Sequence, residues 1–294
     1  MSRSGFVALA GRPNSGKSTL VNRIVGGKVA IVSDKPQTTR REIRGVATGK
    51  DWQLVLVDLP GVQRPRDALT ERMQRQVERT LADADAALFV LNGEQEIGPG
   101  DRFIADALKR SGVPTVTVLN KVDRLDKPRT VRALSAAADL DVQGELFPIS
   151  AINGAGVGPV VERLVALIPE GPFLYPSDET SDQSLDLRLA ELVREQVLLR
   201  TREEVPHSVE VEIDEIEERE TDGLLVVRAR VWAETQSQKG ILVGSGGRMV
   251  RAVGTAARKE IESLLERRVH LELNVRVRKG WRRDEGLLDR LGIE

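Results

Sequence analysis

The stretch Gly11-Arg12-Pro13-Asn14-Ser15-Gly16-Lys17-Ser18 decides the fold of this 294-residue chain. It follows an apolar run at residues 6–10 and opens a stretch in which leucine, isoleucine and valine recur at helical spacing. The spacing G-x-x-x-x-G-K-S is typical of a phosphate-binding loop between a strand and a helix, where backbone N–H groups surround phosphate oxygens. It predicts that Lys17 reaches the β- and γ-phosphates of a nucleotide and that Ser18 binds Mg²⁺.

The composition is that of a globular protein, with 40% hydrophobic and 30% charged residues. The chain has no cysteine, which excludes disulfides and cysteine-ligated zinc and fits a reducing cytoplasm. Only two histidines are present, so a histidine-rich metal site is excluded as well. No apolar run approaches the length of about eighteen residues that a membrane span needs, so we expect a cytoplasmic protein without a transmembrane segment.

Charge is distributed unevenly along the chain, although the net charge is only −1. Residues 1–170 carry 24 basic and 20 acidic side chains, residues 171–234 carry 7 and 17, and residues 235–294 carry 13 and 8. A basic segment that follows an acidic one indicates a polyanionic partner near the C-terminal end. The charge pattern alone fits an ordinary solvated helix face equally well.

Short apolar runs alternate with amphipathic stretches through the first 170 residues. This alternation predicts a mainly parallel sheet with helices on both faces, and it places ligands at the carboxyl ends of the strands. The exception is an expected hairpin of residues 41–48 and 52–57 around a Gly49-Lys50-Asp51 turn. We expect further strands at 5–10, 86–91, 115–119 and 146–149, and helices at 16–26, 68–83, 100–110, 129–139 and 156–168.

An acidic residue and a glycine end the predicted strand at 52–57, in the stretch Asp58-Leu59-Pro60-Gly61. An acid at a strand end beside a phosphate-binding loop can bind Mg²⁺ through water, and a glycine N–H next to it can meet a γ-phosphate. Asp58 and Gly61 are therefore expected at the metal and at the γ-phosphate.

A loop without an apolar period, Gln37-Thr38-Thr39-Arg40, lies between these two motifs. Such a loop can close over Mg²⁺ and the γ-phosphate when a triphosphate is bound, and a hydroxyl is the expected ligand. We call these four residues the switch loop. Thr39 is the first choice for this hydroxyl and Thr38 the second.

The stretch Asn120-Lys121-Val122-Asp123 follows a predicted strand and indicates the base that is bound. The Asp123 carboxylate can accept hydrogen bonds from the N1–H and the 2-amino group of guanine, and adenine offers no such pair of donors. Lys121 is expected to pack its stem over the base, and Asn120 to tie this loop to the phosphate-binding loop. A backbone N–H of Ser150-Ala151 is expected to meet the guanine oxygen.

Together these motifs predict a site for GTP or GDP with Mg²⁺. A phosphate-binding-loop ATPase or a small-molecule kinase is an alternative, and Asp123 argues against it. The residues expected to bind the nucleotide are Gly11, Arg12, Pro13, Asn14, Ser15, Gly16, Lys17, Ser18, Thr19, Asp58, Gly61, Asn120, Lys121, Asp123, Ser150 and Ala151. The expected Mg²⁺ ligands are Ser18, Thr39 and Asp58, and the expected catalytic residues are Lys17, Asn14, Thr39 and Gly61.

A second glycine loop, Gly244-Ser245-Gly246-Gly247, indicates an RNA-binding domain in the C-terminal part. It lies between two predicted helices and matches the G-x-x-G loop of a KH domain, whose backbone holds about four nucleotides of a single strand. A glycine turn between packed helices is the alternative. The low aromatic content of 3% disfavours domains that bind RNA by base stacking. The residues expected to bind RNA are Lys239, Gly244, Ser245, Gly246, Gly247, Arg248, Arg251, Arg278 and Lys279.

The domain organisation follows from these motifs and from the prolines between them. We expect a nucleotide-binding α/β domain at residues 1–170, a linker at 171–184 and a smaller α+β KH domain at 185–294. Within the KH domain, residues 185–200 have helical period, and residues 209–216, 224–232 and 269–277 are expected to be strands.

This combination resembles the Era family of bacterial GTPases over nearly the whole chain. The stretches that carry the resemblance are residues 33–40, Pro169-Glu170-Gly171-Pro172, Glu191-Leu192-Val193-Arg194-Glu195, Val205-Pro206-His207-Ser208 and Lys279-Gly280-Trp281. Leu59 departs from the threonine that is commoner in this family, but its side chain is not a ligand. The resemblance implies a P-loop GTPase domain followed by a type II KH domain. It also implies a ribosome assembly factor that binds the 3′ end of 16S rRNA and matures the small (30S) subunit.

The resemblance further implies a cytoplasmic protein that associates peripherally with the inner face of the cell membrane, and we expect it to act as a monomer. Ras-type GTPases orient the attacking water with a glutamine, and Val62 stands at that position here. Asn14 resembles a residue that coordinates K⁺ between the phosphates in related GTPases, and a bracing role in the loop is the alternative. K⁺ is therefore expected as a second cation beside Mg²⁺, with slow hydrolysis. A signalling GTPase whose C-terminal part binds protein instead of RNA stays as an alternative.

Overall fold

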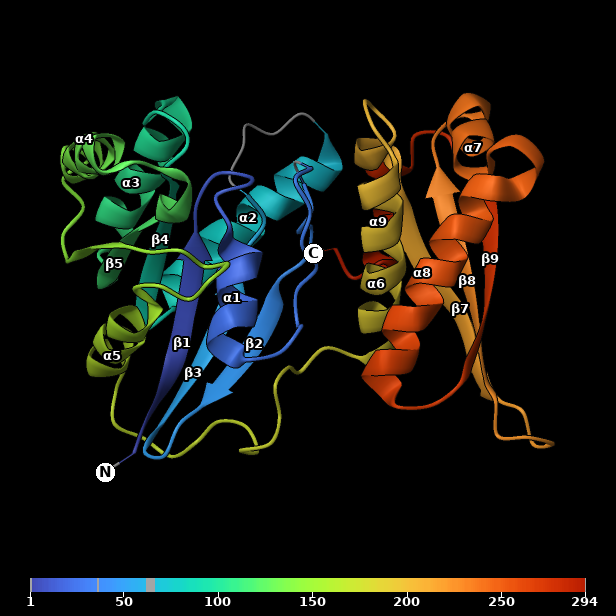
Figure 1. The fold of residues 1–294 in the computed structure, drawn as a ribbon, viewed down its shortest axis with the longest axis horizontal. Coiled ribbons are helices and arrows are strands. Elements are labelled where there is room, and N and C mark those ends of the chain that lie inside the picture. Colours follow the sequence, from blue (N-terminus) through green and yellow to red (C-terminus); the bar gives the residue numbers. More distant parts are fainter. Residues whose placement is uncertain (1, 36, 62–66, 294) are drawn as a thin grey trace. The chain divides into compact units, whose positions relative to one another are not determined.

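The computed structural model describes residues 2–35, 37–61 and 67–293, which form two compact units (Figure 1). The N-terminal unit holds residues up to Val32, residues Thr39–Asp182 and the end of the chain at Ile293. The C-terminal unit holds Gln183–Gly292 together with the short segment Ser33–Thr38. The segment before Thr39 thus packs with a unit that is distant in the sequence.

The N-terminal unit is built on a six-stranded sheet in the order β2-β3-β1-β4-β5-β6. β2 is antiparallel to β3, and the other neighbours are parallel. The described part of this unit therefore confirms the predicted hairpin and the predicted mainly parallel sheet. The strands are β1 (Arg3–Ala10), β2 (Ile43–Thr48), β3 (Trp52–Asp58), β4 (Ala86–Asn92), β5 (Thr115–Asn120) and β6 (Leu146–Pro148).

Helices cover both faces of this sheet because successive residues of a strand point to opposite faces and both sets are largely apolar. In β1, Val7 and Leu9 pack with α1 and α5 in one core, and Ala8 and Ala10 pack with α2, α3 and α4 in another. The carboxyl ends of the parallel strands are left for loops, as in other open α/β sheets. The helices are α1 (Lys17–Val25), α2 (Ala68–Asp83), α3 (Pro99–Ser111), α4 (Lys127–Ala138) and α5 (Val157–Leu167).

The C-terminal unit is a three-stranded sheet covered by helices on one face. Its order is β7-β8-β9, with β7 and β8 antiparallel and β8 and β9 parallel. β8 buries Val227 and Ala229 against α6 and α8, while Arg228 and Arg230 pair with acidic residues of β7 on the other face. The elements are α6 (Leu185–Arg200), β7 (Glu210–Glu218), β8 (Leu225–Ala233), α7 (Gln236–Val243), α8 (Arg248–Leu265), β9 (Val269–Val277) and α9 (Glu285–Arg290).

The segment expected as a linker at 171–184 is largely fastened to the N-terminal unit. The buried Gln53 side chain accepts hydrogen bonds from the N–H groups of Leu174 and Tyr175, at 2.8 and 2.9 Å. Further along, Val46 N–H donates to the Thr180 carbonyl at 2.9 Å. This unit therefore continues to Asp182, and the second begins just before the Ser184 N-cap of α6.

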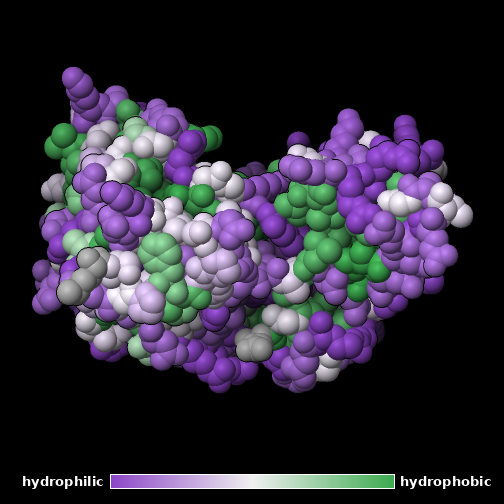
Figure 2. Space-filling view, turned by 90° about the horizontal axis from the view of Figure 1, so that it is seen from below, coloured by the Kyte–Doolittle hydropathy of each residue, from purple (hydrophilic) through white to green (hydrophobic). Residues whose placement is uncertain are grey.

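The surface drawn in Figure 2 is mainly hydrophilic, with hydrophobic side chains gathered in smaller areas on each unit. Among the described residues, no helix has the length and apolar character that crossing a membrane requires.

Candidate functional site

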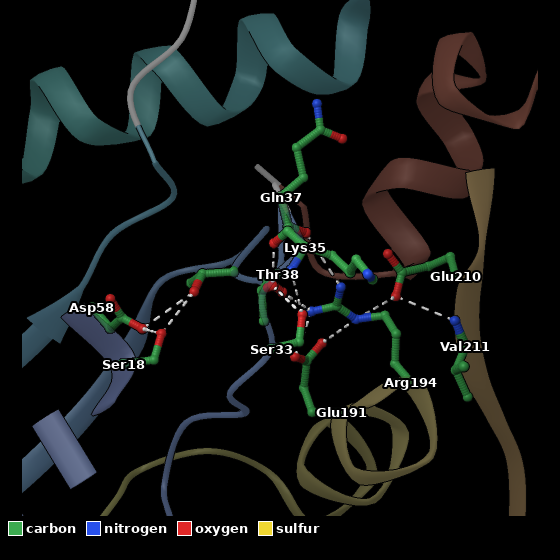
Figure 3. Close-up of polar contacts among 11 residues, drawn as sticks. Ser18, Ser33, Lys35, Gln37, Thr38, Asp58, Glu191, Arg194, Glu210 and Val211 are labelled. Carbon is green, nitrogen blue, oxygen red and sulfur yellow. Dashed lines mark hydrogen bonds and ion pairs between the residues drawn. The ribbon is translucent and has the colours of Figure 1, made fainter. Parts of the chain in front are cut away.

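Three oxygen-bearing side chains meet beside the phosphate-binding loop (Figure 3). Ser18 lies in the first turn of α1, Asp58 ends β3 and Thr39 belongs to the switch loop. Ser18 Oγ lies 2.6 Å from Asp58 Oδ2 and 3.1 Å from Thr39 Oγ1, and Thr39 Oγ1 lies 3.2 Å from the same carboxylate oxygen. Oxygen ligands with one carboxylate are what Mg²⁺ prefers beside phosphates, so this donor set fits Mg²⁺ held with a nucleotide.

The Lys17 side chain is buried inside the phosphate-binding loop. Its Nζ donates to the carbonyls of Gly11 and Arg12, at 3.1 and 3.3 Å. Burial lowers the pKa of Lys17, and the nearby Asp58 carboxylate opposes this shift. The ammonium group is thus placed within the loop, where phosphate oxygens can replace the two carbonyls as its acceptors.

The side chains of Arg12, Pro13 and Ser15 in the phosphate-binding loop each have different neighbours. The Arg12 guanidinium is turned away from the loop and pairs with Asp101 of α3, with Nε and Oδ1 2.9 Å apart. Gly61 lies against Pro13, since a Cβ on Gly61 would come within 2.8 Å of the Pro13 ring. Ser15 Oγ is buried without a hydrogen-bond partner in the part of the chain that the structure describes. The Arg12 side chain therefore braces α3, and its backbone is what the loop uses.

The buried amide of Asn120 joins three loops. Its Nδ2 donates to the Ser15 carbonyl at 2.9 Å, and its Oδ1 accepts from the N–H groups of Lys121 and Ala151 at 2.8 and 2.9 Å. The expected tie to the phosphate-binding loop is therefore present. Gly16 has a φ of 97° and faces the same amide, with 2.2 Å between an added Cβ and Asn120 Nδ2. Only glycine fits there.

The backbone N–H groups of Ser150 and Ala151, one of which is expected at the guanine oxygen, both have partners inside the protein. The N–H of Ala151 binds Asn120 Oδ1, and the N–H of Ser150 donates to the Ala155 carbonyl at 2.9 Å. Both residues are buried. The turn at residues 150–155 uses the Ser150 N–H, and the Asn120 amide uses the Ala151 N–H; contact of either with the guanine oxygen stays a prediction.

The Lys121 side chain is held by an acidic residue that the motif does not contain. Lys121 Nζ lies 3.0 Å from Glu94 Oε2, and Arg124 approaches the other oxygen of the same carboxylate at 3.2 Å. The hydrogen bond from Lys121 is the main cause that lowers the pKa of Glu94. Asp123 is exposed on the turn Val122–Arg124, so its carboxylate is accessible to a base.

The two threonines of the switch loop have different partners. Thr39 lies with Ser18 and Asp58, whereas Thr38 Oγ1 bonds Ser33 Oγ at 2.7 Å and donates to the Lys35 carbonyl at 2.6 Å. Gln37 has a φ of 60°, and Arg40 is buried. Pro36 and Val62 lie outside the described residues. The structure therefore brings the first-choice threonine, and not the second, to the predicted metal corner.

The glycine loop of the C-terminal unit connects α7 to α8 with three residues at positive φ. Gly244, Gly246 and Gly247 have φ values of 70°, 58° and 77°. A Cβ on Gly246 would meet nothing within 4 Å, whereas one on Gly244 would come within 2.8 Å of Met249. The backbone of this loop is thus open on one side. The Arg251 guanidinium bonds the carbonyls of Gly246 and Gly247, so it stiffens the loop.

A groove of about 300 Å³ lies beside this loop, between α8 and β9. Apolar side chains and basic ones share its walls. Of the other predicted RNA contacts, Arg248 and Lys279 are exposed, Lys239 is half-buried, and Arg278 is paired with Asp284. The residues that line the groove are Val250, Arg251, Gly254, Thr255, Arg258, His270, Leu271 and Leu273.

Comparison with known proteins assigns both sites to one family. The family model for a "50S ribosome-binding GTPase" matches residues 6–121, and the KH domain model matches residues 204–282. GTPase Era of Mycolicibacterium paratuberculosis is 45% identical over 295 residues, which cover 99% of both chains. GTPase Era of Mycobacterium tuberculosis is also 45% identical, over 99% of this chain and 98% of its own. The chain belongs to the Era family of GTPases.

Two solved Era structures share the fold of this Era-family chain along its length. A variant of Aquifex aeolicus Era bound to GDP·AlF4⁻ is 34% identical, covers 99% of both chains and has a TM-score of 0.95. Era in complex with MgGDPNP and nucleotides 1506–1542 of 16S ribosomal RNA is 34% identical, with a TM-score of 0.96 and coverage of 100% and 99%. The predicted fold class and the GTPase activity are confirmed for this Era-family protein.

Sequence reasoning missed some residues around both sites of the Era-family chain. Glu94, which holds Lys121, and Asp101, which holds Arg12, belong to no motif, and only their positions after β4 gave a signal. In the groove, His270 and Thr255 were not anticipated. The helical period of α8 places Thr255 beside Arg251 and Arg258 at the groove. The alternation of β9 gives no signal for His270, because it sets His270 on the opposite face from its neighbour Leu271.

Proposed function

We propose that this Era-family GTPase binds the 3′ end of 16S rRNA through its KH domain and promotes maturation of the small (30S) ribosomal subunit. The observation that carries the proposal is the glycine loop, which presents open backbone at Gly246 beside a groove with basic and apolar walls. A single RNA strand needs such a surface, because phosphates approach the glycines while bases enter the groove. The similar Era chain in complex with 16S RNA nucleotides supports the choice of RNA.

GTP and GDP are the proposed nucleotides, with Mg²⁺ as cofactor. Ser18, Thr39 and Asp58 would hold the ion, which supplies charge neutralisation to the β- and γ-phosphates. Lys17 would bind the same phosphates. Asp123 would accept the two donors of the guanine edge, and its exposure leaves it free to do so.

K⁺ is proposed as a second cation, next to Asn14. Asn14 has a φ of 62°, and its carbonyl accepts a hydrogen bond from Asn92 at 3.3 Å. This geometry turns the loop at Asn14, where a side-chain oxygen can add to phosphate oxygens as a ligand. A positive charge there would stabilise the transition state of hydrolysis in the way an arginine finger does. Bracing of the loop by Asn14 is the alternative.

The bound nucleotide is proposed to control RNA binding. GTP would order the switch loop, and RNA would favour the same arrangement of the C-terminal unit. Because coupling is reciprocal, GTP should tighten RNA binding by the same factor by which RNA tightens GTP binding. Typical couplings of this kind are about 5- to 150-fold.

Binding of a labelled RNA with the 3′-terminal sequence of 16S rRNA tests the proposal. Its dissociation constant is measured by fluorescence anisotropy with a nonhydrolysable GTP analogue and with GDP. We expect tighter binding with the analogue, and loss of affinity as salt is raised. Gly246→Asp should weaken RNA binding by charge repulsion and leave GDP affinity unchanged. Lys17→Ala should do the reverse, weakening nucleotide binding and leaving the RNA surface intact. Equal RNA affinities with the two nucleotides would reject the control by GTP, and salt-independent or absent binding would reject the RNA partner.

The cellular location and the oligomeric state of the protein are further proposals. Membership of the Era family supports a cytoplasmic monomer that associates peripherally with the inner face of the cell membrane. Gel filtration with light scattering tests the monomer. Sedimentation with anionic lipid vesicles, with and without GTP, tests the membrane contact.

A further inference from the structure

A buried cationic side chain, Arg194, lies in the middle of α6 and packs inside the C-terminal unit. Its side chain has 0% exposure. Nη2 lies 2.6 Å from Glu191 Oε2, and Nε lies 3.1 Å from Glu191 Oε1 and 3.6 Å from Glu210 Oε1. Two buried carboxylates thus fix the guanidinium plane from α6 and β7. An arginine without such partners would not stay buried, because desolvation of a charge is costly.

The same guanidinium donates to main-chain carbonyls of the segment Ser33–Thr38 (Figure 3). Nη2 donates to the Thr38 carbonyl, and Nη1 lies 3.5 Å from the Gln37 carbonyl. This segment is part of the C-terminal unit and has its own braces, from Thr38 Oγ1 to Ser33 Oγ and to the Lys35 carbonyl. Arg194 therefore holds the last peptide of that segment in place.

The next residue, Thr39, belongs to the N-terminal unit and reaches the metal corner. Its Oγ1 lies 3.1 Å from Ser18 Oγ and 3.2 Å from Asp58 Oδ2. One peptide bond separates the carbonyl that Arg194 holds from the residue that carries this hydroxyl. A shift of the Thr38 peptide must therefore move Thr39, since consecutive Cα atoms are fixed about 3.8 Å apart.

We propose that Arg194 is a positioning residue for the triphosphate state: by holding the Thr38 carbonyl from the C-terminal unit, it keeps Thr39 at the Mg²⁺ corner. The inference rests on the proposed Mg²⁺–GTP site. It adds the residue through which the C-terminal unit acts on that site. Ser18 and Asp58 do not depend on Arg194, so the diphosphate, which needs no contact from the switch loop, keeps its affinity.

Holding the loop requires the planar guanidinium of an arginine, which can donate several hydrogen bonds at once. Lysine at this position can still place a positive charge near Glu191, but a single ammonium cannot donate to both carboxylates and both carbonyls at once. Arg194→Lys therefore removes the grip on the loop and keeps the charge. Arg228→Lys is the matched control. Arg228 also pairs with carboxylates, those of Glu215, Glu217 and Glu272, but it lies on the exposed face of the β7-β8-β9 sheet.

The experiment measures equilibrium binding of a fluorescent nonhydrolysable GTP analogue and of fluorescent GDP to the full chain, at increasing Mg²⁺. For Arg194→Lys we expect the Mg²⁺ concentration for half-maximal analogue binding to rise about tenfold, the equivalent of about 1.4 kcal/mol, because the hydrogen bonds from the charged guanidinium to the loop are lost. GDP binding should change less than twofold, and Arg228→Lys should match the wild type with both nucleotides. Hydrogen exchange at residues 37–40 in the presence of the analogue should be faster in Arg194→Lys alone.

A second variant covers the case in which Arg194→Lys fails to fold. Thr38→Val removes the two hydrogen bonds of Thr38 Oγ1 and leaves Arg194 and its carboxylates in place. It should raise the Mg²⁺ requirement of the analogue in the same direction, again without loss of GDP affinity. An unchanged Mg²⁺ requirement in a folded Arg194→Lys, or an equal loss of GDP and analogue affinity, overturns the inference. If Arg194→Lys does not fold, an unchanged requirement in Thr38→Val overturns it.

The RNA arm separates this inference from the proposed function. The factor by which the analogue tightens RNA binding in the wild type should fall toward one in Arg194→Lys. If the wild type shows no RNA binding at all, the proposed function fails, while the Mg²⁺ comparison, which contains no RNA, still decides the role of Arg194. If the wild type shows the coupling and Arg194→Lys keeps both the coupling and the Mg²⁺ requirement, only the role of Arg194 is rejected.

Discussion

Replacing Asn120 by alanine should disconnect the three loops of the nucleotide site. The Asn120 side chain is 2% exposed and bonds the Ser15 carbonyl and the Ala151 N–H, both in buried surroundings. Each buried main-chain group that loses its partner costs about 1–3 kcal/mol, so the two together cost about 2–6 kcal/mol of unfolding free energy. The third bond, to the Lys121 N–H, is only partly buried, and water can replace it.

The same change should weaken GDP and GTP alike. Asn120 holds the base-binding loop against the phosphate-binding loop, and neither contact involves the γ-phosphate. We expect Asn120→Ala to lower the affinity for both nucleotides by at least about tenfold. This factor corresponds to about 1.4 kcal/mol, which is the net contribution of about one hydrogen bond. Urea unfolding of the nucleotide-free protein measures the overall stability, and hydrogen exchange at residues 115–120 measures the local stability beside the site. Binding of fluorescent GDP measures the affinity.

Asn22→Ala is a matched control in the same unit. Asn22 also makes three hydrogen bonds, to the Val29 N–H and to the Ala30 N–H and carbonyl, at 2.9, 2.9 and 2.7 Å. These bonds brace the turn after α1. Their loss should reduce stability and leave GDP affinity within twofold. The reasoning is refuted if Asn120→Ala keeps wild-type stability, or if Asn22→Ala lowers GDP affinity as much as Asn120→Ala does.

Two further predictions concern the chemistry of the nucleotide site. Asp123→Asn should reduce GTP affinity at least about hundredfold and favour xanthosine triphosphate, because an amide can donate to the 2-oxo group of xanthine, whereas a carboxylate cannot. Competition between the two triphosphates measures the change in preference. An unchanged preference for GTP would show that Asp123 does not bind the base. Hydrolysis should be faster in KCl than in NaCl at equal ionic strength, and Asn14→Ala should abolish the difference; equal single-turnover rates in the two salts would leave Asn14 with the bracing role.

The GTPase domain and the place of its nucleotide site were predictable because the motifs are local in the sequence. Each of the stretches 11–18, 58–61 and 120–123 places several groups at one strand end, so spacing alone reveals the chemistry. The strands and helices of both units were predictable for a related reason, since the strands appear as short apolar runs or as alternating residues and the helices have apolar residues with period 3.6. Helix α9 was not predicted, because the six residues Glu285–Arg290 are too few to show a period.

The fastening of residues 171–182 to the N-terminal unit was not predictable either. Prolines and polar residues suggested a linker, but the Gln53 amide, more than a hundred positions earlier, bonds the Leu174 and Tyr175 N–H groups. A glutamine in a strand carries no sign that its partners are backbone groups elsewhere. The burial of Gln53 in β3, at 0% exposure, becomes reasonable only after these partners are seen.

The grip of Arg194 on the switch loop shows the same limit most clearly. The stretch Glu191–Glu195 reads as one turn of a charged helix, yet Glu191, Arg194 and Glu195 are all buried. Burial of three charges is tolerated only where partners compensate each of them, and here part of the compensation comes from carbonyls 156 and 157 positions away. A carbonyl exists at every residue, so the acceptor leaves no mark in the sequence. The donor does leave one: the burial of charged residues within a predicted helix requires partners, and in this chain those partners include the carbonyl that directly precedes Thr39.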